Sequence, residues 1–444
     1  MSGNERSFDR KSWVVLILFA LAGQIAWSVE NMYFNLFVFD TVSKNLDAIT
    51  LMVQLSGVVA TLVTLVAGTL SDKIGNRRTL ISYGYIIWGV TVALFGFISP
   101  ELMARLFSLD STRAVGVALT AVIVGDCVMT LFGSTANDAA FNAWVTDNTE
   151  SSYRGKVEGV LAIMPLIAML IVAGGFGILV EALGYSTVFL ALGICVSLSG
   201  VIGVFIIRDS KDLKKKGSFA DVIYGFRPSV VKSNTPLYIS LLILMVYGIG
   251  CQIFMPYLII YMKTLLGFSV IEYSIVFGAA ILFGALINLY LGVLSDKHDK
   301  SKLLYIAAAV MAAGLFAMYF SRGMGRIALL LCFGLAGFVM ITGYIFLSAL
   351  TGSIVRDYTP ADDAGKLQGV RMVFSVLIPM LAGPAIGNGI NRLRGIPYEN
   401  AGADAMTTSF VPAPEIFLAA GIAVLLLFAL IPLLCKAIEK RKIS

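Results

Sequence analysis

The sequence predicts an all-α membrane protein in which twelve transmembrane helices form two pseudo-symmetric six-helix halves. Two observations carry this prediction. First, the 444-residue chain is 58% hydrophobic and only 14% charged, and its mean hydropathy is +0.88, whereas a soluble protein carries far more charge on its surface. Second, a charged motif occurs twice. The stretch Gly-Thr-Leu-Ser-Asp-Lys begins at Gly68, and Gly-Val-Leu-Ser-Asp-Lys begins 224 positions later at Gly292.

The individual helices are predicted from apolar runs, because a helix needs about 20 predominantly apolar residues to cross a bilayer. The first run is longer than a signal-peptide core and lacks a small-residue cleavage pattern, so we expect it to be retained. In order, the runs lie at 13–35, 48–70, 80–99, 114–143, 156–180, 186–207, 238–262, 271–293, 303–321, 326–350, 366–389 and 415–435.

The distribution of Lys and Arg predicts the orientation of these spans. With the N-terminus inside, 25 of the 33 basic residues fall in inner segments and 8 in outer loops. Because cytoplasmic loops are enriched in basic residues, both termini are expected in the cytoplasm and the protein in the cell (inner) membrane. The net charge of +6 reflects this bias, and no nucleic-acid partner is needed to explain it.

The predicted halves are residues 1–207 and 237–444, joined by a cytoplasmic linker at 208–236 that contains a run of lysines. We interpret the lysines as a solvated segment facing lipid headgroups, with a regulatory partner site as the alternative. A second repeat, at a constant offset of 210, supports the two-half organisation. Its members are Asp147, Gly155, Lys156 and Gly159, and Asp357, Gly365, Lys366 and Gly369.

The motif that begins at Gly68 contains residue types suited to a gate between two helices. Gly68 allows a neighbouring helix to approach closely, Asp72 is a short acceptor suited to a nearby helix N-terminus, and Gly75 permits a turn with positive φ. Arg77 and Arg78 mark the cytoplasmic surface. An ordinary basic loop is the alternative for a single copy, and the second copy, with Asp296, weighs against it.

The same motif, Gly68-Thr-Leu-Ser-Asp-Lys-Ile-Gly-Asn-Arg-Arg78, resembles the loop between helices two and three of the major facilitator superfamily. The second copy departs from that pattern, because His298-Asp299-Lys300 replaces the glycine and arginines. Arg154-Gly155 resembles the second cytoplasmic signature of the family, at the start of helix five. This resemblance implies a secondary transporter that works by alternating access, with substrate handled between the halves near the membrane midplane.

Polar residues inside a membrane span are costly and point to function. At 100° per residue, the polar residues of the first span form one stripe about 100° wide. Amides and hydroxyls bind sugar hydroxyls and an indole stacks on a sugar ring, so the stripe predicts a substrate cavity, with helix–helix contact as the alternative. The substrate-binding candidates of this stripe are Gln24, Trp27, Asn31 and Asn35.

Three acids in the first half are candidates for coupling to H+ or Na+. Asp126 lies near the middle of the fourth span and shares a face with Thr130 and Asn137, which is a further substrate candidate, whereas Asp138 is rotated by about 120°. An apolar site keeps a carboxylate protonated or lets it bind a hard cation. Glu30 flanks the polar stripe, and two interpretations are open: a coupling group or the partner of a basic residue. For Asp138 the alternative is a structural hydrogen bond.

The second half offers neutral hydrogen-bonding groups and is predicted to form a wall of the substrate site. Tyr257 and Tyr261 are equally consistent with interfacial aromatics. Arg371 is predicted to reach the cytoplasmic surface or to pair with an inner-loop acid such as Asp72. The external loop 390–414 is predicted to be irregular and solvated, with attraction of anions by Arg392 and Arg394 as the alternative. The substrate candidates of this half are Gln252, Tyr257, Asn288 and Tyr344.

Two branches of the superfamily are relevant. Gly-Gln-Ile-Ala-Trp at 23–27 and Arg371 within Gln-Gly-Val-Arg resemble the cation-coupled glycoside, pentoside and hexuronide symporters and the sucrose-type carriers. The two helix-two aspartates of the melibiose-permease branch are absent from this sequence. The drug-antiporter signature of helix five is also absent, while Gly383-Pro384 occurs in the eleventh span, so an efflux antiporter is the alternative function.

Other functional classes lack their signatures in this sequence. We find no nucleophile–base pair, no metal-ligand spacing and no P-loop, so neither an enzyme nor an ATP-driven pump is predicted. The single histidine, His298, lies in a loop, and the five cysteines are scattered over apolar spans. A sensor would need a sizeable soluble domain. The expected protein is a monomer in the lipid bilayer that binds a small-molecule substrate and uses no cofactor beyond a coupling cation.

Overall fold

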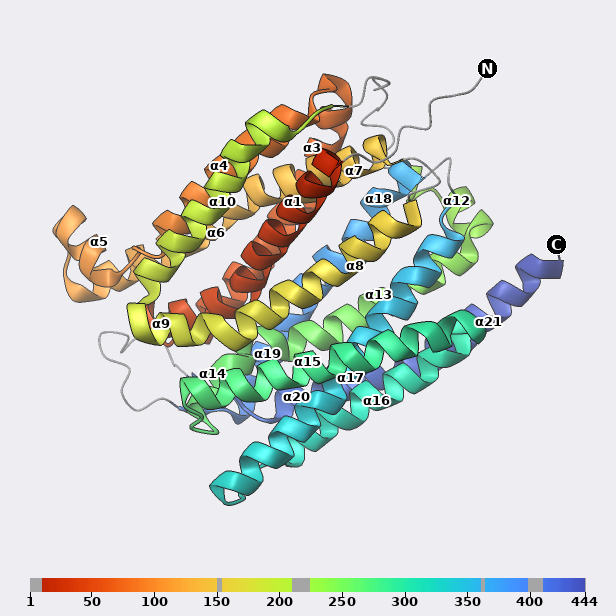
Figure 1. Cartoon of the computed structure of the whole chain (residues 1–444). Coiled ribbons are helices and arrows are strands. Elements are labelled where there is room, and N and C mark those ends of the chain that lie inside the picture. Colours follow the sequence, from red (N-terminus) through yellow and green to blue (C-terminus); the bar gives the residue numbers. More distant parts are fainter. Residues whose placement is uncertain (1–9, 150–153, 210–223, 361–363, 398–409, 444) are drawn as a thin grey trace. The chain divides into compact units, whose positions relative to one another are not determined.

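The computed structural model describes residues 10–149, 154–209, 224–360, 364–397 and 410–443. Within them, twelve helical segments are long and apolar enough to cross a membrane. The segments begin with Arg10–Val42 and Leu46–Gly68 and end with Leu367–Arg394 and Glu415–Arg441, and each coincides with one predicted run. The predicted all-α fold with twelve spans is therefore confirmed (Figure 1).

The described chain divides by contacts into two compact units. Unit 1 contains residues 1–37 and 62–219, and unit 2 contains residues 38–61 and 220–444. The segment Val38–Thr61, although early in the sequence, therefore groups with the second half. The predicted boundaries at 207 and 237 stay a prediction, and residues 210–223 of the linker lie outside the described part of the chain.

In unit 1, α1 (Arg10–Val29) leads through the π-helical turn η1 (Glu30–Phe34) to α2 (Asn35–Phe37). The long helix α3 (Leu46–Ile74) contributes residues to both units. The remaining elements of unit 1 are α4 (Arg77–Phe95), α5 (Pro100–Phe107), α6 (Ser111–Gly133), η3 (Ser134–Phe141), α7 (Asn142–Asn148), α8 (Arg154–Ile171), η4 (Val172–Phe176), α9 (Gly177–Leu183) and α10 (Tyr185–Ile206).

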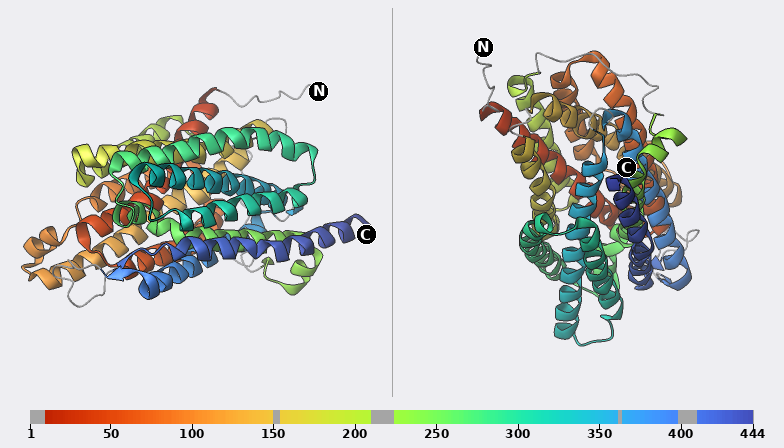
Figure 2. Two further views of the ribbon diagram at one scale, coloured as in Figure 1. Left: turned by 90° about the horizontal axis from the view of Figure 1, so that it is seen from below. Right: turned by 90° about the vertical axis from the view of Figure 1, so that its right-hand side faces the viewer.

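Unit 2 begins with the π-helical turn η2 (Val38–Val42) and the first part of α3. Its core surrounds α13, which packs against α19, α20 and α17. Figure 2 shows the helices of the chain in two further views. The other elements are α12 (Pro228–Ser233), α13 (Thr235–Phe254), η5 (Met255–Tyr257), α14 (Leu258–Thr264), α15 (Val270–Lys297), α16 (Lys300–Phe320), α17 (Arg326–Tyr358), α18 (Ala364–Met372), η7 (Val373–Leu377), α19 (Ile378–Arg394), β1 (Ile396–Pro397), β2 (Phe410–Val411), α20 (Glu415–Leu425) and α21 (Leu427–Ile443).

Several helices begin after a short polar residue whose side chain caps the helix N-terminus. Gly75, with φ +66°, ends α3, and the Asn76 side chain then accepts a hydrogen bond from the Thr79 backbone N–H at 3.0 Å to start α4. Ser269 and Glu272 form a capping box at α15. Because these caps satisfy backbone N–H groups that have no intrahelical partner, they fix where each helix starts. The positive φ predicted at Gly75 is confirmed.

Helix packing in unit 1 uses small residues. A Cβ added at Gly89 of α4 would lie 2.3 Å from the carbonyl oxygen of Gly193 in α10. The two helices therefore approach backbone to backbone, as lipid-embedded helices do where small residues line their interface. Large apolar side chains such as Leu62 and Ile194 remain exposed, which suits a surface that contacts lipid chains.

The outer segment 390–414 differs from the irregular loop that the sequence predicts. Helix α19 continues through Arg394, and β1 pairs antiparallel with β2 through Ile396 opposite Val411 and Pro397 opposite Phe410. The side chain of Asn391 also accepts a hydrogen bond from the Ala413 N–H at 2.9 Å. The prediction of an irregular loop was therefore wrong at both ends of the segment, while residues 398–409 lie outside the described part of the chain.

Candidate functional site

The polar residues of unit 1 gather where α1, α4 and α6 meet. Most of these side chains are buried: the exposed fraction is 8% for Glu30 and 2% for Asp126, and Thr130 is fully buried. Because no water solvates a polar group in such a position, each must find its partners within the protein. We refer to this group as the unit 1 polar cluster; it comprises Trp27, Glu30, Tyr85, Asp126, Thr130, Asn137 and Asp138.

Two π-helical turns shape this cluster. Element η1 starts at Glu30, and η3 carries both Asn137 and Asp138. A π-helical turn inserts an extra residue into the helix and is frequently found at functional sites. A wheel of uniform 100° steps therefore loses its register across these turns. The Asn137 Nδ2 donates to Asp138 Oδ1 at 3.1 Å, so these consecutive side chains are in contact. The faces predicted for the two residues stay predictions.

Asn137 links three parts of the cluster. Its Oδ1 lies 2.8 Å from the Tyr85 hydroxyl, which is also 2.7 Å from the backbone carbonyl oxygen of Phe19. The hydroxyl has one hydrogen to share between these two acceptors. On the other side of Asn137, its Nδ2 donates to the Asp138 carboxylate. This chain of contacts joins α4, η3 and α1 inside the membrane span.

Glu30 and Asp126 form the carboxylate end of the cluster. The Thr130 hydroxyl donates to Glu30 Oε1 at 3.3 Å, and Asp126 precedes Thr130 by one helical turn on the same face of α6. Carboxylate and hydroxyl oxygens are the ligands that hard cations prefer, and a buried carboxyl also holds a proton readily. Within the described residues, no group of three His, Cys, Asp or Glu side chains is arranged to hold a metal ion.

Aromatic rings border the same cluster. The ring centroids of Trp27 and Trp88 are 5.0 Å apart, and those of Tyr85 and Trp88 are 5.4 Å apart. Gly23 makes room for this arrangement, because a Cβ at Gly23 would lie 2.5 Å from Asn137 Oδ1 and 2.7 Å from the Tyr85 hydroxyl oxygen. Gly23 and Trp27 both belong to the Gly-Gln-Ile-Ala-Trp stretch of the first span.

The other residues of the predicted stripe lie on α1 and its continuation. Gln24 is partly buried, Asn31 is exposed and Asn35 is buried. The Asn31 Nδ2 donates to the Trp27 carbonyl oxygen at 2.8 Å, and the Asn35 Nδ2 donates to the Asn31 carbonyl oxygen at 3.2 Å. Both amides thus bond to the preceding turn of their own helix. Their role in substrate binding stays a prediction.

The predicted substrate residues of the second half make contacts within unit 2. The Tyr257 side chain is fully buried, and its hydroxyl lies 2.7 Å from Thr50 Oγ1 and 3.0 Å from the Pro384 carbonyl oxygen. Asn288 donates to the carbonyl oxygens of Gly284 and Thr342, at 2.8 and 3.1 Å, and so links α15 to α17.

Gln252 and Tyr344, the remaining two candidates, are each partly buried. Tyr344 packs against Tyr247 with ring centroids 5.7 Å apart and the rings tilted by 35°, and Gln252 packs against Gly383. The structure therefore leaves these four candidates of the second half dispersed over α13, η5, α15 and α17, and their substrate role also stays a prediction.

The motif residues occupy the end of α3 and the start of α4. Arg77 is buried, and its Nε pairs with Asp147 Oδ2 at 3.0 Å while a terminal nitrogen donates to the Ser71 hydroxyl. The backbone N–H of Arg78 donates to Asp209 Oδ1 at 2.9 Å. Within the described residues, a Cβ at Gly68 would meet no heavy atom within 4 Å, so the predicted close helix approach at Gly68 is not seen in this structure.

Three other predicted gate residues are placed less completely. Asp72 lies in α3 and Asp296 in α15, but their side chains fall outside what the structure describes. Arg371 is exposed in the last turn of α18. The gating roles of these residues stay predictions.

A corresponding ion pair exists in unit 2. Lys300 follows the second copy of the motif, and its Nζ lies 2.8 Å from Asp357 Oδ2 and 2.7 Å from the Ser353 hydroxyl. Asp147 and Asp357 are equivalent members of the internal repeat with offset 210. In each unit, a cation from the motif region therefore pairs with the repeat-related aspartate, which the sequence alone did not reveal.

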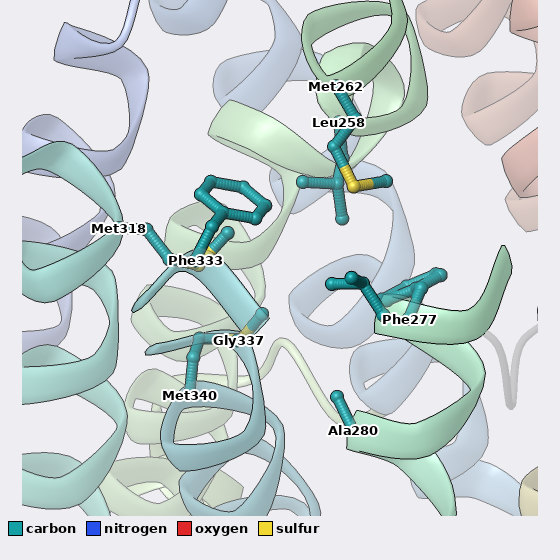
Figure 3. A pocket seen from close by; sticks show the side chains of 9 residues that line it. Leu258, Met262, Phe277, Ala280, Met318, Phe333, Gly337 and Met340 are labelled. Carbon is teal, nitrogen blue, oxygen red and sulfur yellow. The ribbon is translucent and has the colours of Figure 1, made fainter. Parts of the chain in front are cut away.

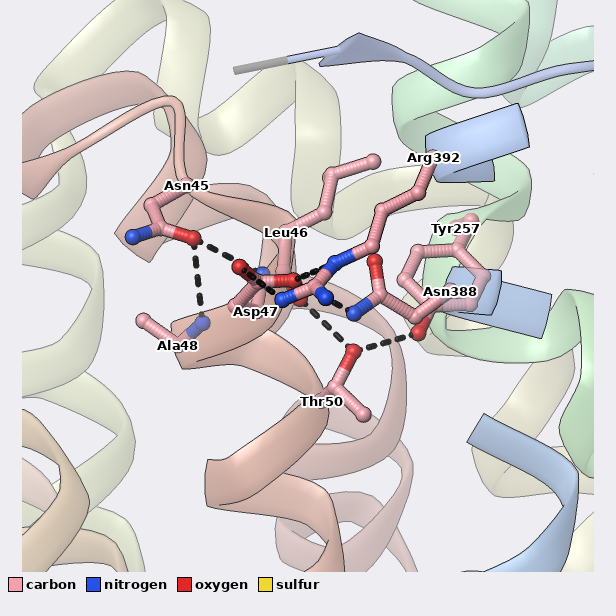
Figure 4. Close-up of polar contacts among 8 residues, drawn as sticks. All are labelled: Asn45, Leu46, Asp47, Ala48, Thr50, Tyr257, Asn388 and Arg392. Carbon is pink, nitrogen blue, oxygen red and sulfur yellow. Dashed lines mark hydrogen bonds and ion pairs between the residues drawn. The ribbon is translucent and has the colours of Figure 1, made fainter. Parts of the chain in front are cut away.

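A second polar network holds the segment Val38–Thr61 within unit 2 (Figure 4). Asp47 accepts two hydrogen bonds from Arg392, at 2.9 and 2.6 Å, and a third from Asn388 Nδ2 at 2.6 Å. Asp40 pairs with Lys263, with Nζ 2.7 Å from both carboxylate oxygens. We call these two ion pairs the outer ion pairs. The sequence reasoning missed them and placed Arg392 in an irregular loop, whereas it lies in helix α19 with a side chain that is 58% exposed.

Lys44 lies beside the outer ion pairs in the short connection between η2 and α3. Burial lowers the pKa of Lys44, the negative charge of Asp40 opposes this effect, and the positive charge of Lys263 adds to it. The Lys44 Nζ also lies 4.6 Å from the centroid of the Phe39 ring. The connection is thus a compact charged surface at one end of the unit 2 helices.

A small cavity in unit 2 is lined by apolar side chains, including Met262, Phe277, Phe333 and Met340 (Figure 3). Its volume of about 10 Å³ is at the lower limit for one water molecule. It is too small for a substrate and has no polar lining, so we regard it as a packing gap between α14, α15 and α17.

Comparisons with known proteins agree with this architecture. The sequence matches the Major Facilitator Superfamily profile over residues 16–384 and 241–442. The chain belongs to the Major Facilitator Superfamily. It is therefore a transporter of that superfamily, and the coarse prediction of a secondary transporter is confirmed; the narrower branch stays a prediction. A comparison with curated proteins finds no match.

Solved structures share the fold of this superfamily member at low sequence identity. The nucleoside transporter NupG is 12% identical, with a TM-score of 0.65 over 94% of this chain and 98% of that one. A bacterial homologue of the human lysosomal transporter Spinster, in an inward-facing and unoccupied conformation, is 15% identical with a TM-score of 0.68 over 97% and 98%. A bacterial homologue of the iron transporter ferroportin is 15% identical with a TM-score of 0.62 over 95% and 98%. At these identities, the similarity shows the fold alone.

Proposed function

We propose that the protein is a secondary active transporter that moves a small polar solute, a sugar or a glycoside, by alternating access coupled to H+ or Na+. The observation that carries this proposal is the unit 1 polar cluster. Within one membrane-spanning layer it places two buried carboxyl groups, Glu30 and Asp126, next to amide, hydroxyl and indole groups. Ionisable residues inside a membrane are expensive and are retained for ion or substrate handling.

The carboxylate end of the cluster supplies the coupling. Asp126 and Glu30 take up a proton or a cation on one side of the membrane and release it on the other. Thr130, which bonds Glu30 at 3.3 Å, contributes a further oxygen ligand. A bound proton or cation neutralises the buried carboxylate and so lowers the free-energy cost of keeping it in an apolar environment while the protein reorients. Because this cost differs between the ion-bound and the ion-free protein, ion binding is coupled to reorientation.

The aromatic end of the cluster supports the substrate class. The indole of Trp27, which is partly buried, packs on the fully buried Trp88, and Asn137 and Asp138 provide amide and carboxylate groups in the same cluster. Sugars present both apolar ring faces and hydroxyl groups, so an aromatic surface flanked by hydrogen-bonding groups is well matched to them. Nucleosides also carry a sugar, and the structural likeness to NupG makes them a useful comparison class.

The alternative function, an efflux antiporter, rested on Gly383-Pro384 in the eleventh span. Packing explains this glycine, because a Cβ at Gly383 would lie 2.3 Å from the Cβ of Gln252. Gly383 thus lets α19 approach α13, and this contact carries no information on the direction of transport. Sugar uptake remains the first function to test.

The test is uptake by purified protein in proteoliposomes. A panel of labelled monosaccharides, glycosides and nucleosides would be offered under an imposed pH gradient, an imposed Na+ gradient or neither, with protein-free liposomes as the control. We expect one sugar or glycoside to accumulate above its external concentration only when one of the gradients is present. Accumulation of nucleosides alone, or of no solute under either gradient, would contradict the proposed substrate class.

A further inference from the structure

A groove of about 450 Å³ lies on unit 1 between α1 and α10. Its α1 wall runs from Val14 to Ile25, and its α10 wall includes Leu192 and Cys195. Several of these side chains are open at the surface; the exposed fractions of Val14 and Ile17 are 55% and 43%. The volume lies within the range of ligand sites in proteins, which is about 300–1,000 Å³.

The length of the groove matches one leaflet of a membrane. From Val14 to Ile25, α1 rises about 16 Å at 1.5 Å per residue. The hydrocarbon core of a bilayer is about 30 Å thick, so the α1 wall spans about half of it. The wall begins one residue after Trp13, a partly buried residue of the type that is enriched at the membrane–water interface. An acyl chain that starts at the headgroup level would therefore lie along the groove.

Two cations continue the same helix face beyond the groove. Arg10 precedes Val14, Ile17 and Leu21 by four, seven and eleven residues, and Lys11 precedes Val14 and Leu18 by three and seven. These spacings place both cations on the face that forms the groove. Both side chains are exposed. Because α1 and α10 are the first and sixth spans, the start of α1 and the end of α10 lie on the same side of the membrane, where the exposed Arg208 follows α10.

We propose that this groove is a binding site for an anionic phospholipid. The acyl chain lies between α1 and α10, and the phosphate lies against Arg10 and Lys11. Basic groups at the end of a groove between membrane helices are suited to anionic headgroups. An anionic headgroup brings a net negative charge to Arg10 and Lys11, whereas a zwitterionic headgroup also brings a cation beside them, and a second transmembrane helix would cover the apolar wall without supplying an anion. The charge at one end therefore favours a lipid over a protein partner.

Cys195 offers a direct probe, because it is exposed and lines the groove. A fluorophore would be attached to a variant that retains only Cys195. The labelled protein would be placed in phosphatidylcholine vesicles containing a minor fraction of phosphatidylglycerol, with bromine on the acyl chains of one lipid or the other. Quenching reports which lipid contacts the groove. The matched control retains only Cys332, an exposed cysteine of α17 in unit 2.

We expect brominated phosphatidylglycerol to quench the probe at Cys195 more strongly than its share of the lipid predicts, and the probe at Cys332 in proportion to that share. Each Lys or Arg near an anionic leaflet strengthens binding about fivefold. The variant Arg10→Gln/Lys11→Gln should therefore lose the enrichment by fivefold or more, whereas Lys440→Gln/Arg441→Gln, at the end of α21, should keep it.

A second variant, Ala22→Trp, fills the groove while leaving both cations in place. It should also abolish the enrichment, because the acyl chain loses its place. Three results would overturn the proposal: quenching at Cys195 in proportion to each lipid's share, enrichment that survives Arg10→Gln/Lys11→Gln, or a probe that neither lipid quenches because protein covers the groove. Because the measurement does not use transport, it is independent of the proposed function.

Discussion

At the scale of single residues, the unit 1 polar cluster depends on space as much as on polarity. Asn137 reaches both Tyr85 and Asp138 because Gly23 leaves the α1 surface open at that point. A polar side chain that loses its partner in such a buried position carries a desolvation cost of about 1–3 kcal/mol. Gly23 therefore leaves the space that the hydrogen bonds of Asn137 require.

We predict that Gly23→Ala lowers the free energy of unfolding by about 1–3 kcal/mol, because the added methyl group would lie 2.5 Å from Asn137 Oδ1 and force the network apart. Thermal unfolding of the purified protein measures the change. The control is Gly116→Ala in α6, where a Cβ would meet no heavy atom within 4 Å among the described residues; it should be neutral or slightly stabilising. Equal stability of the two variants would contradict the packing role.

At the scale of elements, the turn from α3 to α4 is fixed by Gly75 and by the buried Arg77. Arg77 lies almost out of contact with solvent, whereas Asp147 is about a quarter exposed. Removing the cation leaves Asp147 and Ser71 without this donor, and the three residues come from three different elements, α3, α4 and α7. The pair thus ties the motif to the end of the fourth span.

We predict that Arg77→Gln lowers the free energy of unfolding by about 1–3 kcal/mol and slows transport, while the affinity for substrate changes little. Chemical unfolding, equilibrium binding and transport rate should be measured on one preparation. The control is Arg113→Gln, whose ion pair with Asp110 is exposed at both partners; such pairs contribute less than about 1 kcal/mol. Unchanged stability of Arg77→Gln, or a selective loss of binding, would argue against a gate role.

The outer ion pairs define the second element of interest, the segment Val38–Thr61. Reorientation by alternating access requires contacts that form in one state and break in another, and ion pairs that are partly exposed can do so at low cost. The side chains of Arg392 and Asp47 retain exposed fractions of 58% and 41%. The two hydrogen bonds between Arg392 and Asp47 fix the relative orientation of these side chains. Because both side chains are partly exposed to solvent, the ion pair contributes little to stability.

We predict that Arg392→Asp slows transport, because two acids would then face each other, and that Asp47→Arg/Arg392→Asp restores most of the rate. Transport rates of Asp47→Arg, Arg392→Asp and the double variant, compared with the parent, form a double-mutant cycle. A neighbouring control is Arg394→Asp, whose side chain is also exposed on α19 and is outside the outer ion pairs. A double variant as slow as the single variant would show that the charge complementarity is not what matters.

The elements of this protein differ in how far they can be predicted from the sequence. The twelve spans were predictable because a run of apolar residues reports directly on the length of a membrane helix. The face of each polar residue was less predictable, because the π-helical turns η1 and η3 shift the register after Glu30 and Ser134. The outer ion pairs were missed because Asp47 and Arg392 are 345 residues apart, and in one sequence nothing marks such a pair.

At the scale of the whole molecule, the buried acids of the described residues, Glu30 and Asp126, both belong to unit 1. Glu30, Asp126 and Asp138 lie within the membrane spans of unit 1, whereas the candidates in unit 2 are neutral. From this asymmetry we propose that unit 1 handles the coupling ion. A carrier of this kind must bind its ion before it reorients, so a permanently neutral side chain at the coupling position should mimic the occupied state.

The most direct measurement compares gradient-driven uptake with counterflow exchange for Asp126→Asn and Glu30→Gln in proteoliposomes. Asp110→Asn is the control, because this exposed acid caps α6 outside the cluster and asparagine caps a helix equally well. We predict that Asp126→Asn, and to a lesser extent Glu30→Gln, abolishes accumulation against a gradient while exchange continues, and that Asp110→Asn behaves like the parent. If Asp126→Asn, Glu30→Gln and Asp138→Asn all accumulate substrate as the parent does, the carboxylates are structural and the account of coupling is wrong.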